Sequence, residues 1–248
     1  MNLLIDIGNT RVKWALARGH TLAETGAIWR ARHPDWTARL PSDSLDGIYV
    51  ASVADDSAIQ ALRIFAADHA LAVHRVVSTA RSGPLVNAYA RPERLGVDRW
   101  MACVAAQARA EGSVLIADVG TALTLDWVGA DGVHGGGLIA PGVNSMRLAL
   151  RNATQLRPTH VPDEHAWLAR DTDSAIAAGT LRCAIAVLDS AALDLAPDRL
   201  LLTGGEAELL APRLARPWQV VPHLVLEGLA VHAEREARGG QPARQRSE

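Results

Sequence analysis

Residues 2–10 read Asn-Leu-Leu-Ile-Asp-Ile-Gly-Asn-Thr, and residues 113–121 read Ser-Val-Leu-Ile-Ala-Asp-Val-Gly-Thr. In each stretch a short apolar run of strand length ends at an Asp, and a glycine turn follows. Alternating polar and apolar residues come next, at 11–16 and 123–128, which predicts a second strand instead of a helix. Nucleotide-binding units of the Rossmann and P-loop types need a helix directly after the glycine loop, so the pattern disfavours both.

The strand–turn–strand unit occurs twice, and this repeat predicts a duplicated α/β fold. We expect an N-terminal lobe over residues 1–110 and a C-terminal lobe over residues 111–238. No low-complexity linker separates them, so close packing of the two lobes is expected. The polar residues 239–248 are expected to fray.

Periodicity and turn residues predict the remaining elements of both lobes. In the first lobe these are strands at 21–29, 46–52 and 72–77, a helix at 57–69, loop over most of 78–97, and a helix from Asp98 to about Ala110. In the second lobe they are strands at 136–140, 199–203 and 219–221, and helices at 143–150, 171–195, 206–214 and 225–238.

Composition excludes several classes of protein. Of the 248 residues, 49% are hydrophobic and 21% charged, which is enough to bury a sizeable core. A formal net charge of -2 gives no broad basic field for nucleic acid and no polybasic surface for membranes. Cys103 and Cys183 lie far apart without metal-ligand spacing, which favours buried free thiols. No secretory signal or membrane span is expected, so the sequence predicts a cytoplasmic protein.

The turn after Asp6 has the chemistry of a phosphate loop. Gly8 lets backbone come close to a ligand. Successive N–H groups of the turn can form an anion-binding nest, and Thr10 can add a hydroxyl donor. Since a carboxylate repels phosphate, Asp6 indicates a cation between the two, usually Mg²⁺. Ordinary hairpin turns use the same residues, so one copy does not decide between the two interpretations.

The second copy, Asp118-Val119-Gly120-Thr121, is harder to explain as turn chemistry alone, because its form and its context are the same. A duplicated fold would let two such hairpins face each other across a cleft and bracket the phosphates of one nucleotide. The pair therefore predicts ATP binding and transfer of the γ-phosphate to a small metabolite.

Two further motifs each allow two interpretations. Asp98 is either the N-cap of a helix or a carboxylate base beside an anion-binding Arg99. Gly204-Gly205-Glu206 is either a simple strand-to-helix turn or a place where adenine or a ribose phosphate approaches the backbone.

Taken in order, five segments resemble the type III pantothenate kinase family, and the resemblance spans residues 6–205. The segments are Asp6-Ile7-Gly8-Asn9-Thr10, Leu95-Gly96-Val97-Asp98-Arg99, Asp118-Val119-Gly120-Thr121-Ala122-Leu123-Thr124-Leu125-Asp126, Gly136-Gly137-Leu138-Ile139-Ala140-Pro141-Gly142 and Gly179-Thr180. The resemblance implies the acetate and sugar kinase/Hsp70/actin-like ATPase fold, which has two ribonuclease H-like lobes with a cleft between them. It also implies a transferase activity, the ATP-dependent phosphorylation of pantothenate to 4′-phosphopantothenate, which is the first step of coenzyme A biosynthesis.

The resemblance assigns roles to individual residues. Asp98 is implied as the catalytic base toward the substrate hydroxyl, and Asp118 as the ligand of a monovalent metal or ammonium cation, K⁺ or NH₄⁺. Mg²⁺ would accompany ATP, and the enzyme would be a homodimer with Thr180 near the subunit interface. The ATP-binding residues are implied as Asp6, Ile7, Gly8, Asn9, Thr10, Arg11, Val12, Lys13 and Thr121. The pantothenate-binding residues are implied as Tyr89, Gly96, Val97, Asp98, Arg99 and Thr180.

Two rival functions remain open at this point. One is a kinase of the same fold that acts on another small metabolite. The other is a non-catalytic ATP-binding regulatory protein, for which a base at Asp98 would have no use. A duplicated α/β interaction domain with turn-like Asp-Gly hairpins is a third interpretation, and ATP binding would separate it from the other two.

Overall fold

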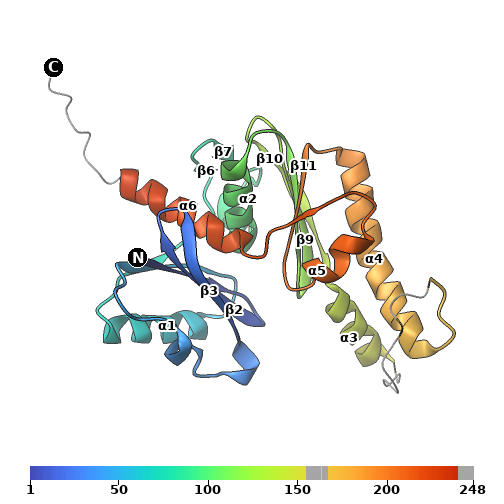
Figure 1. Cartoon of the computed structure of the whole chain (residues 1–248), viewed down its shortest axis with the longest axis horizontal. Helices are drawn as coiled ribbons and strands as arrows, with labels where there is room; N and C mark the ends of the chain where they lie inside the picture. The colour runs from blue at the N-terminus through green and yellow to red at the C-terminus, as the bar shows by residue number, and fades with distance from the viewer. Residues whose placement is uncertain (155–162, 164–166, 240–248) are drawn as a thin grey trace. The chain divides into compact units, whose positions relative to one another are not determined.

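The computed structural model describes residues 1–154, residue 163 and residues 167–239, and it divides the chain into two units by contacts. Unit 1 comprises Met1–Glu111, Gly132–His134 and the chain from His223 onward, whereas unit 2 comprises Gly112–Asp131 and Gly135–Pro222. Each unit is built around one five-stranded sheet (Figure 1). The chain therefore passes from one unit to the other four times.

The sheet of unit 1 has the strand order β3-β2-β1-β4-β5. Its strands are β1 (Asn2–Ile7), β2 (Arg11–Arg18), β3 (Thr21–Trp29), β4 (Gly47–Ser52) and β5 (Val73–Arg75). β1 pairs antiparallel with β2 and parallel with β4. Leu3, Leu4 and Ile5 are all fully buried, so β1 is covered on both faces, as its continuous apolar run predicts.

The sheet of unit 2 repeats this order as β10-β9-β8-β11-β12. Its strands are β8 (Val114–Val119), β9 (Ala122–Val128), β10 (His134–Pro141), β11 (Arg199–Thr203) and β12 (Gln219–Val220). As in unit 1, the first strand pairs antiparallel with the second and parallel with the fourth. The repeated order confirms the predicted duplicated α/β fold.

Helices cover the sheets and close two separate hydrophobic cores. They are α1 (Asp56–Asp68), α2 (Val97–Arg109), α3 (Val143–Ala153), α4 (Thr172–Leu195), α5 (Ala207–Leu210) and α6 (Leu224–Gly239). The short elements are the strands β6 (Arg81–Ser82) and β7 (Leu85–Val86) and four 3₁₀ turns at Arg30–Arg32, Trp36–Arg39, Pro92–Arg94 and Ala211–Arg213. Asp171 is the N-cap of α4, and its carboxylate accepts from the Ser174 N–H at 2.8 Å. This agrees with the helix start predicted at this acidic residue.

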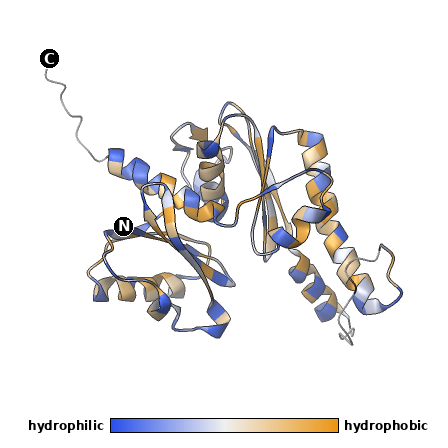
Figure 2. Cartoon of the chain, in the orientation of Figure 1, coloured by the Kyte–Doolittle hydropathy of each residue, from blue (hydrophilic) through white to orange (hydrophobic). Residues whose placement is uncertain are grey.

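Helix α6 packs against α2 within unit 1. The sequence predicts a C-terminal lobe over residues 111–238, which includes α6, so the contact units differ from the predicted lobes at the C-terminal end. The physical reason is that α2 is buried along most of its length and α6 starts with an apolar stretch that covers it. Figure 2 shows α6 changing from hydrophobic near its start to hydrophilic near its end. Of the predicted tail at 239–248, residues 240–248 lie outside the described residues.

One helix of the described residues, α4, is long and apolar enough to cross a membrane by length and composition. The same helix contributes Leu181, Ala184, Leu188 and Ala192 to the core of unit 2. Burial of an apolar face against a sheet accounts for its composition.

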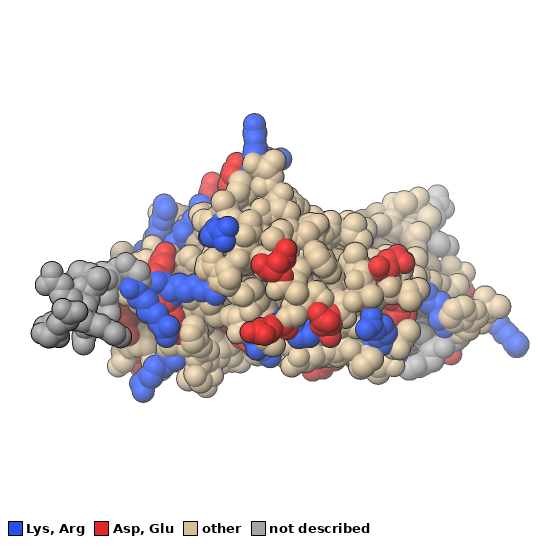
Figure 3. All heavy atoms as spheres, turned by 90° about the horizontal axis from the view of Figure 1, so that it is seen from above, with Lys and Arg blue, Asp and Glu red and all other residues tan. Residues whose placement is uncertain are grey.

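On the face drawn in Figure 3, basic and acidic side chains are interspersed.

The structure corrects the prediction in one place that bears on the site. Asp98 is not the N-cap of α2, because the helix begins at Val97 and Gly96 is the N-cap. Asp98 lies in the first turn, where its carboxylate oxygen Oδ1 accepts from the Arg99 N–H at 2.8 Å. The simple capping interpretation of this residue is therefore wrong.

Candidate active site

The Asp6 hairpin lies at the end of β1 and opens onto an exposed turn. Asp6 and Gly8 are half-buried, Ile7 is buried, and the turn residues Asn9 and Thr10 are exposed. The Gly8 N–H donates to the Arg11 carbonyl at 3.0 Å and closes the turn. The other residues predicted to bind ATP, Arg11, Val12 and Lys13, lie at the start of β2.

Arg30, which the sequence analysis did not single out, holds this hairpin from outside. Its guanidinium donates to the carbonyl oxygens of Gly8 at 3.4 Å and Asn9 at 3.5 Å, and it pairs with Asp55 at 3.3 Å. Hydrogen bonds from the Ser57 hydroxyl and the Ala58 N–H, together with Arg30, lower the pKa of the exposed Asp55 to about 2. Asp55 therefore stays ionised, caps α1 and anchors Arg30.

The Asp118 hairpin is fixed by close backbone packing instead. Gly204 has φ +98, and a Cβ there would clash with the Val119 carbonyl and lie 2.5 Å from Asp118 Oδ1. A Cβ at Gly142 would clash with the Gly120 carbonyl. The Glu206 N–H also donates to the Val119 carbonyl at 3.0 Å. Two glycines thus let neighbouring loops lie directly against this hairpin.

Glu206 joins these loops through the start of α3. Its carboxylate accepts from the N–H groups of Val143 at 3.1 Å and Asn144 at 3.3 Å, and from Asn144 Nδ2 at 2.7 Å. It caps α3 from a distant part of the chain, since the N-cap residue itself offers no side chain. The Ser145 hydroxyl, in the same helix turn, donates to the Thr121 carbonyl at 2.6 Å and so reaches the predicted ATP contact.

The Gly204-Gly205-Glu206 segment has a structural role in this packing, and the approach of a nucleotide to it stays a prediction. The segment leaves β11 and its glycine touches the Asp118 loop, so its first function is to shape that loop. The spacing of a Gly pair after a buried strand is visible in the sequence, but the loop that it meets is not.

Five of the six predicted substrate residues, all except Thr180, come together in unit 1 around the start of α2. Arg99 is buried, and its guanidinium NH1 donates to the Tyr89 hydroxyl at 3.1 Å. Gly96 and Asp98 lie in the same helix turn as Arg99, and the Gly96 carbonyl accepts from the Trp100 N–H. The structure thus links Tyr89, which lies in a loop, to the helix that carries Asp98.

Thr180 lies in unit 2, in the middle of α4, and is 5% exposed. Its hydroxyl donates to the Ile176 carbonyl at 2.8 Å and accepts from Arg147 Nε at 3.2 Å. Arg147 also donates to the Ala177 carbonyl at 3.3 Å. Arg147, on α3, is a second charged residue next to the predicted site that sequence reasoning missed.

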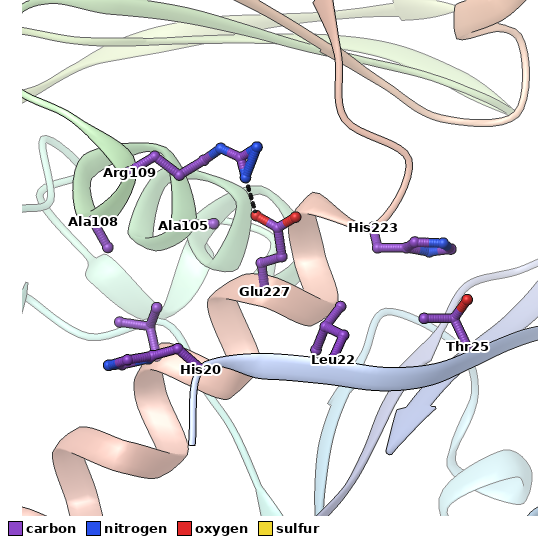
Figure 4. Close-up of a pocket in the computed structure, with 9 residues that line it drawn as sticks. His20, Leu22, Thr25, Ala105, Ala108, Arg109, His223 and Glu227 are labelled. Carbon is purple, nitrogen blue, oxygen red and sulfur yellow. Dashed lines mark hydrogen bonds and ion pairs between the residues drawn. The ribbon is translucent and has the colours of Figure 1, made fainter. Parts of the chain in front are cut away.

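A groove of about 570 Å³ lies in unit 1 between β3, α2 and α6 (Figure 4). It contains an ion pair of Arg109 and Glu227 at 2.6 Å. Burial, and then the positive charge of Lys13, lowers the pKa of His223 on its wall. The residues that line it are His20, Leu22, Thr25, Ala105, Ala108, Arg109, His223, Glu227 and Val231, so it includes none of the predicted site residues.

Comparison with solved structures shows the fold. A Baf family protein of Campylobacter jejuni superposes with a TM-score of 0.61, at 19% identity, over 95% of this chain and 99% of that one. A protein described as a candidate N-acetylmannosamine kinase from Listeria monocytogenes gives a TM-score of 0.50 at 14% identity, over 95% and 99%. At these identities the likeness carries the architecture alone, and it is that of the actin-like ATPases and sugar kinases.

Comparison of sequences shows the family. Residues 2–192 match the family model described as type III pantothenate kinase. A relative of that name from Halorhodospira halophila is 38% identical over 96% of this chain and 100% of its own length. Another from Nitrosococcus oceani is 35% identical over 93% of this chain and 92% of its own length. The chain belongs to the type III pantothenate kinase family.

Proposed function

We propose that this enzyme transfers the γ-phosphoryl group of ATP to the primary hydroxyl of pantothenate, giving 4′-phosphopantothenate and ADP in coenzyme A biosynthesis. The observation that carries the proposal is the family match over residues 2–192, because this range contains every residue implied in the chemistry, from Asp6 to Thr180. The linked pair of Arg99 and Tyr89 beside Asp98 supports a substrate site at the start of α2.

In this mechanism Asp98 accepts the proton of the substrate hydroxyl as its oxygen attacks the γ-phosphorus in line. A bond forms between that oxygen and phosphorus, the bond from phosphorus to the bridging β,γ oxygen breaks, and ADP leaves with that electron pair. Arg99 binds a polar or anionic group of pantothenate. Most of the rate enhancement comes from positioning and from charge stabilisation by loop N–H groups.

The hairpins supply the chemistry that the ions require. Asp6 presents a half-buried carboxylate at the end of β1, a hard oxygen ligand suited to Mg²⁺ bound with ATP. Asp118 presents a second carboxylate among the packed carbonyls of its loop, which suits a monovalent cation such as K⁺ or NH₄⁺. Bound cations neutralise charge on the phosphate oxygens. In this proposal the N–H groups of Asn9 and Thr10 and the Thr121 side chain bind ATP, and Gly8, whose N–H closes the turn on the Arg11 carbonyl, lets the backbone come close to the phosphates.

We also infer a cytoplasmic homodimer. On unit 2 the side chains of Leu138 and Ile139 in β10 and of Leu148 in α3 are each more than half exposed, and self-association would cover exposed apolar side chains of this kind. Light scattering of the purified protein tests the dimer, and Ile139→Glu is expected to shift it toward monomer. A wild-type protein that is monomeric at micromolar concentration would contradict it.

The test of the activity is ADP release that depends on pantothenate, measured with K⁺, with NH₄⁺ and with Na⁺ alone. In Asp98→Asn we expect kcat to fall by ~10²–10⁴, the usual contribution of a general base, while calorimetric ATP binding is retained. No pantothenate-dependent release from the wild type would reject the function in favour of another acceptor. ATP binding with turnover unchanged by Asp98→Asn would reject Asp98 as the base.

A further inference from the structure

Three residues at the junction of the β9–β10 turn and the start of β10 belong to unit 1 although the chain on both sides of them belongs to unit 2. They are Gly132, Val133 and His134. The Val86 N–H donates to the Gly132 carbonyl at 2.9 Å, and Val86 and Val133 form a parallel bridge. Gly132 has φ +78, and a Cβ there would lie 3.0 Å from the Pro84 carbonyl. The segment is therefore seated against the loop that leads to Tyr89.

His134 is the residue through which this segment reaches the substrate loop. It is completely buried, and its ring stacks on Tyr89 with 6.1 Å between centroids and 24° between planes. This is within the range of favourable offset aromatic pairs. The backbone of Tyr89 is fixed separately, by its N–H bond to Asn87 Oδ1 at 3.0 Å. Stacking on His134 is thus a contact of the side chain itself, separate from the bond that fixes its backbone.

The Tyr89 ring in turn holds Arg99, since its hydroxyl accepts from the guanidinium at 3.1 Å. Asn87 adds rigidity, because Nδ2 donates to the carbonyls of Thr79 at 3.2 Å and Pro92 at 3.4 Å. A continuous path of contacts thus leads from His134 through Tyr89 to Arg99, all within unit 1.

We propose that His134 is a positioning residue for the pantothenate site, acting on Arg99 through the ring of Tyr89. The proposal rests on the proposed function. His134 contacts the tyrosine and takes no part in proton or phosphoryl transfer. Its loss therefore weakens the binding of pantothenate more than it slows the chemical step, and it leaves the binding of ATP unchanged.

The kinetic test compares His134→Ala with His134→Phe, which keeps an aromatic ring. In His134→Ala the KM for pantothenate should rise about 3- to 10-fold, the value of one aromatic pair, with the KM for ATP and kcat each within about 2-fold. His134→Phe should recover most of this loss. Val133→Ala is the matched control, because Val133 is the adjacent residue and its side chain is 40% exposed.

A second comparison separates positioning from general destabilisation. In a Tyr89→Ala background, His134→Ala should cause no further rise in the KM for pantothenate. His134 acts through the ring of Tyr89, and that ring is already absent. Two results would overturn the proposal. One is an equal rise of the KM for pantothenate in both backgrounds. The other is a rise of both KM values and a fall of kcat by the same factor.

A spectroscopic test does not depend on activity. The chain has 2 tyrosines, Tyr49 and Tyr89, so ring-labelled tyrosine gives two sets of NMR signals. Loss of the neighbouring ring in His134→Ala, or in His134→Asn if the alanine chain does not fold, should shift the Tyr89 signals. The Tyr49 signals should stay, since Tyr49 stacks on His74 at 4.6 Å. Unchanged Tyr89 signals would overturn the inference, whereas an inactive wild type with shifted Tyr89 signals would overturn only the proposed activity.

Discussion

The Asp6 hairpin and the Asp118 hairpin occupy equivalent places in the two sheets, yet the structure fixes them by different means. The first is exposed at its tip and is held by the guanidinium of Arg30 on two carbonyls. The second is held by backbone, with Gly142 and Gly204 lying against it and no room for a side chain at either position. The two units therefore share the hairpin but differ in the contacts that stabilise it.

This difference teaches what each loop tolerates. A charged clamp at an exposed position is weakened by salt and by loss of the charge, but it leaves the loop free to adjust. The stability of a loop held by close backbone packing does not depend on salt, but one added methyl group disrupts the packing. The second arrangement holds the carbonyl oxygens of its loop in constant positions, which the proposed cation site at Asp118 requires.

The largest effect is expected from Gly204→Ala. The added Cβ would clash with the Val119 carbonyl and the backbone would be strained at φ +98, so the free energy of unfolding should fall by about 3 kcal/mol. Urea denaturation measures this. Gly179→Ala is the control. Gly179 is exposed on α4, and a Cβ there would have no atom within 4 Å, so stability should not decrease. Equal stability of Gly204→Ala and wild type would show that the loop is loosely packed.

Glu206→Gln should have the next largest effect. The amide keeps the shape but presents one acceptor oxygen to the three donors of Val143 and Asn144, so about 1–2 kcal/mol of stability should be lost. Thermal unfolding measures the loss. Glu208→Gln is a suitable control, since Glu208 lies two residues away in α5 and outside this set of bonds. A loss no greater than that of the control would remove Glu206 from the support of the loop.

Arg30→Met tests the charged clamp. Its bonds to the loop are long and partly exposed, so stability should change by less than ~1 kcal/mol, while the KM for ATP rises about 3- to 10-fold. Added salt should raise the KM for ATP more in the wild type than in Arg30→Met. Arg63→Met on the exposed face of α1 is the control. The same salt dependence in wild type and Arg30→Met would contradict an electrostatic clamp.

The smallest effect concerns protonation next to the Asp6 hairpin. Burial, followed by the charge of Lys13 in β2, lowers the pKa of His223 below its ordinary 6.5. The unfolded chain therefore binds a proton that the folded chain does not, so this residue makes stability fall as pH drops below 6.5. In Lys13→Met the pKa of His223, followed by NMR, should rise toward 6.5. An unchanged pKa would show that burial alone sets it.

Local signals in the sequence were sufficient for the elements and for the duplication. The apolar runs ending at Asp6 and Asp118 predicted both β-hairpins, and the Ala- and Leu-rich stretch after Asp171 predicted α4. The contacts of the predicted site residues were not predictable, because Arg30, Glu206 and His134 touch residues far away in sequence and carry no periodicity. Asp98 was ambiguous for a different reason, since an acidic residue in the first helical turn and one at the N-cap give the same local pattern.

The packing of α6 on α2 has a consequence for how the chain is made. Residues 1–111 leave the ribosome first, but the buried face of α2 is covered only when residues 224–239 have also been synthesised. The first unit to begin folding is thus the last to be completed, and α2 exposes apolar side chains throughout translation of the second unit. For the same reason, a fragment cut at residue 111 should aggregate when it is expressed alone.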